Sequence, residues 1–220
     1  MNAISVKNLN KVFTYYEKKE GFQHSLKNLL VRKQKTKEAV KNISFDIDSG
    51  DIIGFLGPNG AGKTTTLKML SGILYPTSGE VHVLGYCPWK RQKEFKMKYS
   101  MVLGQKSQLW PGLPASETFR LNQYIYEVDE RKCKMLLDEL TEYLDVKHLL
   151  NVQVRRLSLG ERMKLELIAS LIHSPQLIFL DEPSIGLDLV SQKKIRPFIG
   201  YWNEQHKTIA TITSHSMKDI

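Results

Sequence analysis

The sequence predicts an α/β fold in which a mainly parallel sheet is flanked by helices. Short apolar runs at residues 52–56, 176–180 and 208–213 suit strands that are buried on both faces. Stretches with apolar residues at helical spacing separate these runs, and strands that alternate with helices favour a parallel sheet covered on both sides. A chain of 220 residues is long enough for one domain with a sizeable core.

Antiparallel strands are expected ahead of this alternating pattern, at residues 4–13 and 39–48. The stretch 14–38 between them is rich in lysine and arginine. Within it, apolar residues recur at helical spacing: Phe22, Leu26, Leu29 and Leu30. This spacing predicts a basic amphipathic helix inside a loop insertion. The apolar face of that helix either packs on the parent domain or contacts lipid headgroups or a membrane partner.

A glycine-rich loop follows the expected strand at residues 52–56. Residues 57–64 read GPNGAGKT and match the pattern G-x-x-x-x-G-K-[ST], ahead of a helix expected from about residue 63 to 70. Glycines expose backbone N–H groups to phosphates, and the helix adds its positive N-terminal end. Lys63 supplies a charge for the terminal phosphates and the Thr64 hydroxyl can ligate Mg²⁺. The sequence therefore predicts a P-loop NTPase. The expected nucleotide-binding residues of this loop are Gly57, Pro58, Asn59, Gly60, Ala61, Gly62, Lys63, Thr64 and Thr65.

The middle of the chain predicts an inserted α-helical subdomain. Strands are expected at 81–83 and 100–103, and the pattern then turns helical. One apolar stripe follows Pro114, which a first helical turn tolerates, and a second follows Asp129, a suitable N-cap. A further helix is expected over 160–172. We therefore divide the chain into a nucleotide-binding core at 1–104 and 161–220 and a helical subdomain at 105–160.

Two carboxylates follow the apolar run that ends at Leu180. Strands of a parallel sheet bind ligands at their carboxyl ends, which is where Asp181 and Glu182 are expected to lie. Asp181 can hold Mg²⁺ through water, and Glu182 can orient the water that attacks a phosphate.

The sequence LSLGE at residues 157–161, ahead of Asp181, resembles the signature of ABC-type ATPase domains. Three further segments resemble motifs of that family: Gln105 its Q-loop glutamine, SIGLD at 184–188 its D-loop, and His215 its switch histidine. The resemblance covers nearly the whole chain, from about residue 4 to residue 220.

The resemblance implies that two such domains form a head-to-tail dimer, a homodimer in the simplest case, with two ATP molecules between them. Ser158 and Gly160 of one domain close over the γ-phosphate bound by the other. The implied catalytic residues are Glu182, His215, Lys63 and Gln105. The implied Mg²⁺ ligands are Thr64, Gln105 and Asp181. The adenine-stacking ring is assigned to Phe13, with Tyr15 and Tyr16 as alternatives and a place in the core as the other reading of Phe13.

The chain departs from the family pattern in two places. Its signature reads LSLGE where the family most often has LSGGQ, so the side chains of Leu159 and Glu161 are expected to turn away from the phosphate. Family members normally continue past the histidine, so the chain is expected to lack their usual C-terminal continuation, whose strands would cover a sheet edge.

Charge and composition bear on partners and location. The net charge of +9 indicates an anionic partner or a single basic surface loop. No apolar run has the length of a membrane span, and the two cysteines suit reduced thiols. The stretch GQKSQLW at residues 104–110, with the basic insertion and the spacing from Ala39 and Val40, resembles the ATPases of drug and polyketide exporters. This resemblance implies a peripheral subunit on the cytoplasmic face of the cell membrane that powers export through separate transmembrane permease subunits. Trp110 lies where the family docks such subunits.

Two other functions are weighed against transport. A soluble ABC ATPase acting on the ribosome or on nucleic acid would also suit the basic charge. Repair enzymes of that kind carry long coiled coils and translation factors carry two cassettes, and the sequence contains neither. A small-molecule P-loop kinase would have no use for the LSLGE motif.

Overall fold

The computed structural model describes residues 2–16, 34–104 and 106–214. Within these residues the strands form two sheets. The first is antiparallel, with the order β2-β1-β4, and consists of β1 (Asn2–Tyr16), β2 (Gln34–Asp48) and β4 (Ser78–Val83). The second is parallel, with the order β3-β7-β6-β5, and consists of β3 (Ile52–Leu56), β7 (Ile209–Ser214), β6 (Leu177–Asp181) and β5 (Tyr99–Leu103). The predicted α/β fold is therefore confirmed.

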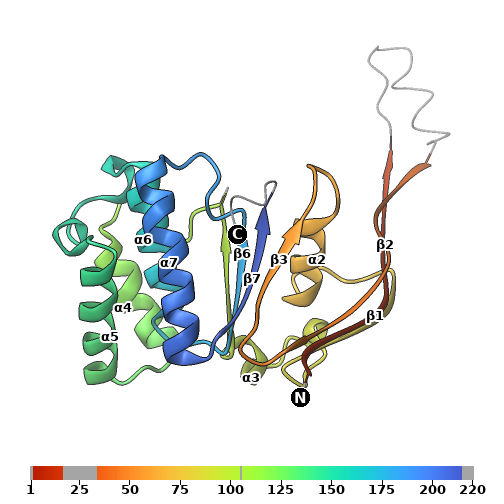
Figure 1. The fold of residues 1–220 in the computed structure, drawn as a ribbon, viewed down its shortest axis with the longest axis horizontal. Helices are drawn as coiled ribbons and strands as arrows, with labels where there is room; N and C mark the ends of the chain where they lie inside the picture. The colour runs from red at the N-terminus through yellow and green to blue at the C-terminus, as the bar shows by residue number, and fades with distance from the viewer. Residues whose placement is uncertain (1, 17–33, 105, 215–220) are drawn as a thin grey trace, which may run out of the picture.

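Helices cover both faces of the parallel sheet (Figure 1). The helix α2 (Lys63–Leu70) lies on the side of the antiparallel sheet, and α6 (Leu159–Leu171) and α7 (Leu189–His206) lie on the opposite side. The helices α4 (Ala115–Ile125) and α5 (Glu130–Tyr143) form an outer layer beyond α6 and α7. The short helix α3 (Lys93–Lys96) and three 3-10 turns, at Pro88–Lys90, Lys147–Leu149 and Val154–Arg156, complete the described elements.

Strand β6 separates two hydrophobic cores. All five of its residues are buried, and successive side chains of a strand point to opposite faces. Leu177 and Phe179 pack with α2 and the antiparallel sheet, whereas Ile178 and Leu180 pack with α6 and α7. Burial on both faces makes β6 a rigid support for the carboxylates at its end.

The N-terminal strands are longer than expected. Residues 14–16 and 34–38, assigned above to a loop insertion, continue the β1–β2 hairpin, where Thr14 pairs with Thr36 and Tyr15 with Lys35. Threonine and tyrosine favour strands, and both faces of this part of the hairpin are exposed, so its lysines stay in solvent. The hairpin projects from the body of the molecule (Figure 1). The expected basic helix with Phe22 and Leu26 lies outside the described residues.

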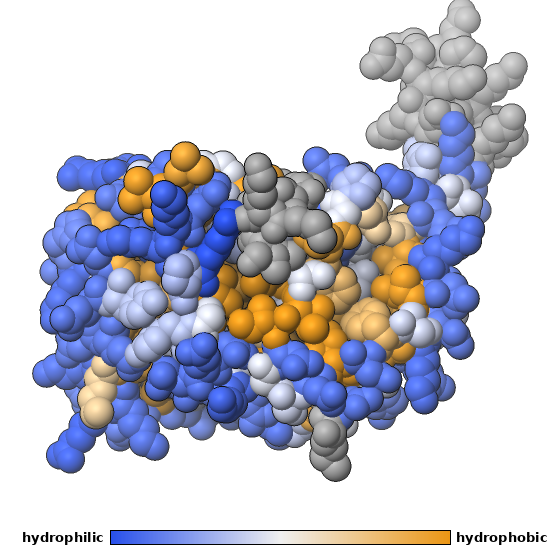
Figure 2. Space-filling model, in the orientation of Figure 1, coloured by the Kyte–Doolittle hydropathy of each residue, from blue (hydrophilic) through white to orange (hydrophobic). Residues whose placement is uncertain are grey.

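Two surface features concern possible partners. None of the helices in the described part of the chain is long and apolar enough to span a bilayer. Figure 2 shows apolar surface in the middle of the face drawn, over the region of β7 and β3. Strand β3 forms an edge of the parallel sheet, and its Ile52 and Leu56 are exposed.

Candidate functional site

A pocket opens where the antiparallel sheet, the glycine-rich loop and the end of β6 meet. The loop and α2 contribute Asn59, Gly60, Ala61, Gly62, Lys63, Thr64 and Thr65 to its lining, and the end of β6 contributes Glu182. The hairpin contributes Phe13, Lys37 and Ala39. Segments far apart in the sequence therefore line one pocket.

The loop takes its shape from glycine. Gly62 has φ of 92°, which L side chains rarely adopt, and a Cβ there would lie 2.3 Å from the carbonyl oxygen of Ala39. Gly62 is also the N-cap of α2, which has no acidic residue in its first turn. The N-terminal N–H groups and partial positive charge of α2 therefore remain available to an anion in the pocket.

Lys63 is held above the loop by a small set of oxygen atoms. Its ammonium group donates to the carbonyl oxygens of Gly57 at 2.6 Å and Pro58 at 3.1 Å. Glu182 lies 3.9 Å away, and only 7% of the lysine side chain is exposed. The loop thus fixes a cation beside a carboxylate at the floor of the pocket.

Hydroxyl groups connect α2 and β7 to the end of β6. The Thr64 hydroxyl donates to both carboxylate oxygens of Asp181, at 2.8 and 2.9 Å. The Thr213 hydroxyl donates to Asp181 at 2.8 Å and accepts from the backbone N–H of Glu182 at 2.9 Å. Asp181 is 9% exposed, so these contacts hold a nearly buried carboxylate.

The donor set fits Mg²⁺ rather than a softer metal. The described residues contain no cluster of three or more His, Cys, Asp or Glu side chains that could hold a metal ion. Mg²⁺ is commonly bound through one or two carboxylates together with substrate phosphates and water. Thr64 and Asp181 supply adjacent hard oxygen atoms next to the phosphate loop, which is the arrangement that such binding needs.

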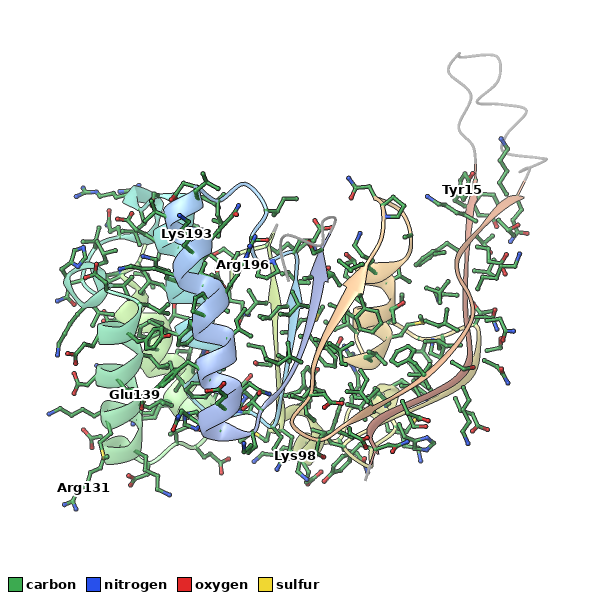
Figure 3. All side chains as sticks on the ribbon, in the orientation of Figure 1. Tyr15, Lys98, Arg131, Glu139, Lys193 and Arg196 are labelled. Atoms are coloured by element: carbon green, nitrogen blue, oxygen red, sulfur yellow. The ribbon has the colours of Figure 1, made fainter. Side chains whose placement is uncertain are left out.

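Phe13 is the aromatic residue of the hairpin that reaches the pocket. Phe13 is 38% exposed as a whole residue, so it is not a core residue, and the Lys11 ammonium lies 5.1 Å from its ring centre. Tyr15 and Tyr16 do not line the pocket. Figure 3 shows Tyr15 at the far end of the hairpin, away from α2.

The signature residues lie at the N-terminus of α6. Because α6 runs opposite to the strands, Ser158 is at the same end of the sheet as the glycine-rich loop (Figure 1), yet neither Ser158 nor Gly160 lines the pocket. Ser158 is the N-cap, and Glu161 folds back onto it: its carboxylate accepts from the Ser158 N–H and hydroxyl, both at 2.8 Å. These hydrogen bonds lower the pKa of Glu161, which is therefore ionised.

Of the two departures from the usual signature, Leu159 is exposed and Glu161 is partly buried. Leu159 is 39% exposed and reaches toward Gly186. Gly160 is buried against the start of α7, where a Cβ would lie 2.1 Å from the Ser191 hydroxyl oxygen. Gly160 thus allows α6 and α7 to approach closely.

Two expected site residues, Gln105 and His215, lie outside the described residues. Their described neighbours are at the site. The N–H of Gly104 donates to the Asp181 carbonyl at 2.9 Å, and Ser214 pairs with Leu56 at the start of the loop.

Sequence reasoning did not identify Thr213, Lys37 or Ala39 as site residues. Thr213 looks like any polar residue at a strand end, and only the pairing of β6 with β7 brings it to Asp181. The Ser158–Glu161 capping box could have been found, because S-x-x-E ahead of an apolar helix is its known pattern.

The chain is similar to proteins of one known family. Residues 40–185 match the profile of a family described as ABC transporter. The chain is 32% identical over 188 residues to the ABC transporter ATP-binding protein NatA of Bacillus subtilis (strain 168), covering 86% of this chain and 76% of NatA. It is 32% identical over 185 residues to the bacitracin transport ATP-binding protein BcrA of Bacillus licheniformis, covering 84% of this chain but only 59% of BcrA.

Solved structures share the fold. The dimeric, post-hydrolysis structure of the ATP-binding cassette MJ0796 bound to ADP and Pi superimposes with a TM-score of 0.78 at 22% identity, covering 98% of this chain and 89% of that one. The structure of cbiO1 from Clostridium perfringens, part of the ABC transporter complex cbiONQ, gives a TM-score of 0.77 at 20% identity, covering 100% of this chain and 80% of cbiO1.

Proposed function

The chain belongs to the ABC transporter family, as an ATP-binding and ATP-hydrolysing domain, and from this premise we propose that its pocket binds MgATP and that hydrolysis there powers transport through separate membrane subunits. The observation that carries the assignment is the hydrogen-bonded set of Thr64, Asp181 and Thr213, with Lys63 and Glu182 beside it. The loop supplies a cation and a hydroxyl, the end of β6 supplies two carboxylates, and β7 supplies the hydroxyl that holds them.

Phosphate binding falls to the loop and α2. The backbone N–H groups of residues 60–64 and the N-terminus of α2 attract the anionic β- and γ-phosphates. Lys63 adds a full positive charge from a position fixed by the carbonyl groups of Gly57 and Pro58. Phe13 stacks on the adenine ring, and Lys37, its cross-strand partner, lies beside the same end of the pocket.

Hydrolysis requires a water molecule directed at the γ-phosphate. Glu182 follows β6 and is held through its backbone N–H by Thr213, so its carboxylate can orient and deprotonate that water. Mg²⁺, when bound by Thr64, Asp181 and the phosphates, neutralises the charge that develops on the phosphate oxygens. Gln105 and His215 are proposed to contact the metal and the γ-phosphate respectively.

The site is proposed to be completed by a second copy of the chain. Ser158 and Gly160 lie at the same end of the sheet as the loop but do not line its pocket. Two copies related head to tail would place the Ser158 hydroxyl and the N-terminus of α6 of one copy over the γ-phosphate held by the other.

Transport is favoured over a soluble role because the relatives NatA and BcrA are both named as transport proteins. The name of BcrA refers to the antibiotic bacitracin, which favours export. The proposed partners are separate transmembrane permease subunits at the cytoplasmic face of the cell membrane. Trp110 and Leu113, which are 55% and 39% exposed in the segment after Gln105, would contact them.

The test is MgATP binding and turnover by the purified chain and two variants. Glu182→Gln should keep ATP affinity while turnover falls on the order of a hundredfold or more, since only the water-orienting carboxylate is changed. Lys63→Ala should instead weaken ATP binding, because it removes the positive charge that contacts the phosphates. Removing Mg²⁺ with a chelator should stop turnover. Full activity in Glu182→Gln would disprove the assignment of that residue.

A further inference from the structure

A buried carboxylate lies in the helix that follows the signature. Glu166 is on α6, about two turns after Ser158, and is only 5% exposed. Glutamate is almost never buried to this extent without partners. Glu166 does not line the ATP pocket, so its burial has a different reason.

The partners of Glu166 are all in the segment that follows Gln105. Its carboxylate accepts from the Ser107 hydroxyl. The backbone N–H of Gln108 donates to both carboxylate oxygens of Glu166, at 2.9 and 3.0 Å. The backbone N–H of Leu109 approaches one oxygen at 3.4 Å. One helix side chain therefore satisfies several consecutive donors of a loop. Hydrogen bonds to an ionised carboxylate are stronger than those between neutral groups, which strengthens this attachment.

Other contacts tie the same segment to neighbouring elements. The Gln108 side-chain amide donates to the Met101 carbonyl of β5 at 2.6 Å, and Leu109 is buried in the hydrophobic core that also contains residues of α4 and α6. Further along, the N–H groups of Arg155 and Val154 donate to the carbonyls of Pro111 and Leu113, at 2.9 and 3.1 Å.

Trp110 therefore lies between two attachments on the side of the signature. Glu166 holds residues 107–109 from one direction, and the turn Val154–Arg156, just ahead of Ser158, holds residues 111–113 from the other. Trp110 itself is 55% exposed between them. The position of this exposed ring is set by the signature helix as well as by β5.

The pKa of Glu166 is raised above its usual value, chiefly by burial. The donors of Ser107, Gln108 and Leu109 and the nearby charge of Arg162 act in the opposite direction. The buried Nε of Arg162 has no hydrogen-bond partner among the described residues, so this arginine acts through its charge.

We propose that Glu166 is a positioning residue that fastens the segment after Gln105 to the signature helix, so that the signature and the Trp110 surface move as one body. The role in coupling rests on the proposed function, while the attachment itself does not. A partner that presses on Trp110 would thereby displace the N-terminus of α6, and closure over ATP would displace Trp110.

The decisive variant is Glu166→Gln, which keeps the size of the side chain but places an amide donor against the Gln108 N–H. Glu142→Gln on the exposed surface of α5 is the control for loss of one charge. The signal of Trp110 is obtained by subtracting the fluorescence of the same protein with Trp110→Phe, which removes the contributions of Trp89 and Trp202.

Without nucleotide, acrylamide should quench Trp110 about twofold more in Glu166→Gln than in the control, because the attachment is lost. With MgATP, kcat should fall about tenfold while KM stays within twofold, since the ATP pocket is intact but the Gln105 segment is misplaced. Ser107→Ala, which removes one donor, should show the same changes to a smaller degree and serves if Glu166→Gln does not fold.

Unchanged quenching in a folded Glu166→Gln protein would overturn the attachment. Increased quenching with wild-type kcat would overturn the coupling. If the wild-type chain itself neither binds nor hydrolyses ATP, the proposed function fails and the coupling with it, and the quenching measurement then decides only whether the attachment exists.

Discussion

Replacing Glu161 by glutamine should strengthen the ATP-dependent pairing of two chains. In the structure the Glu161 carboxylate accepts the Ser158 hydroxyl at 2.8 Å, and that hydroxyl is the group proposed to donate to the γ-phosphate of the neighbouring copy. Pairing therefore requires the Ser158 hydroxyl to give up its hydrogen bond to Glu161. It also brings the Glu161 carboxylate close to the γ-phosphate, and both are anions. Glutamine keeps the capping box, because either residue can fill its third helical position.

The size of the effect follows from the geometry. A phosphate oxygen bonded to the Ser158 hydroxyl at about 2.7 Å would lie within about 5.5 Å of the Glu161 carboxylate. Two unit charges at that separation repel by about 0.8 kcal/mol at the dielectric constant of water and by about 3 kcal/mol at an effective value of about 20. Because Glu161 is only partly buried, we expect the lower part of this range, about a fourfold to tenfold gain per nucleotide site.

The assay is sedimentation velocity with MgATP, in chains that also carry Glu182→Gln so that ATP persists. Glu161→Gln should form dimers at lower protein concentration, and its advantage should shrink as salt screens the charges. Glu204→Gln is the matched control, because Glu204 is exposed at the other end of α7, about 20 Å from Ser191 by helix rise. No gain for Glu161→Gln, or an equal gain for the control, would refute the reasoning.

Three further outcomes are expected. Phe13→Ala should weaken ATP binding about tenfold in a fluorescent-nucleotide titration, because stacking on the base is lost, whereas Tyr15→Ala should not; equal losses would contradict the assignment. Gly160→Ala should destabilise the fold by about 1–3 kcal/mol in urea unfolding, and Ser191→Gly should restore part of the loss by removing the clashing atoms; a lack of rescue would show that the contact with α7 is not the cause. Burial lowers the pKa of His173 to about 4, so the unfolded chain binds a proton that the folded chain excludes, and stability should fall by up to about 3 kcal/mol as the pH drops from about 6.5 toward 4. His173→Phe should flatten that dependence, since phenylalanine can stack on Tyr126 without titrating, and an unchanged pH slope would exclude His173 as its source.

The elements around the phosphate site were predictable because local signals agree there. The apolar run before Gly57 and the residues Lys63–Leu70 form the expected strand and helix with the expected bounds. Residue type and spacing point to the same structure at this site. The expected burial of residues 52–56 on both faces was wrong, because β3 is an edge strand whose Ile52 and Leu56 are exposed.

Prediction was weaker where the structure depends on non-local pairing. The hairpin continues through residues 14–16 and 34–38, where charge suggested a loop, because each strand satisfies the backbone of the other while its side chains stay in solvent. Helix α7 has no counterpart among the expected elements, since Pro197 interrupts its pattern. Glu166 reads as an ordinary polar position, and only the folded chain shows that residues 107–109 cover it.

The central claim is that the phosphate loop of one chain and Ser158 of another form a single ATP site. It is tested most directly by mixing Lys63→Ala with Ser158→Ala protein, each nearly inactive alone, and measuring MgATP turnover. Mixed dimers contain one site in which both Lys63 and Ser158 are intact, so random pairing should restore about a quarter of wild-type turnover if each site acts independently. Turnover that never exceeds the average of the two separate variants would contradict a site shared between chains.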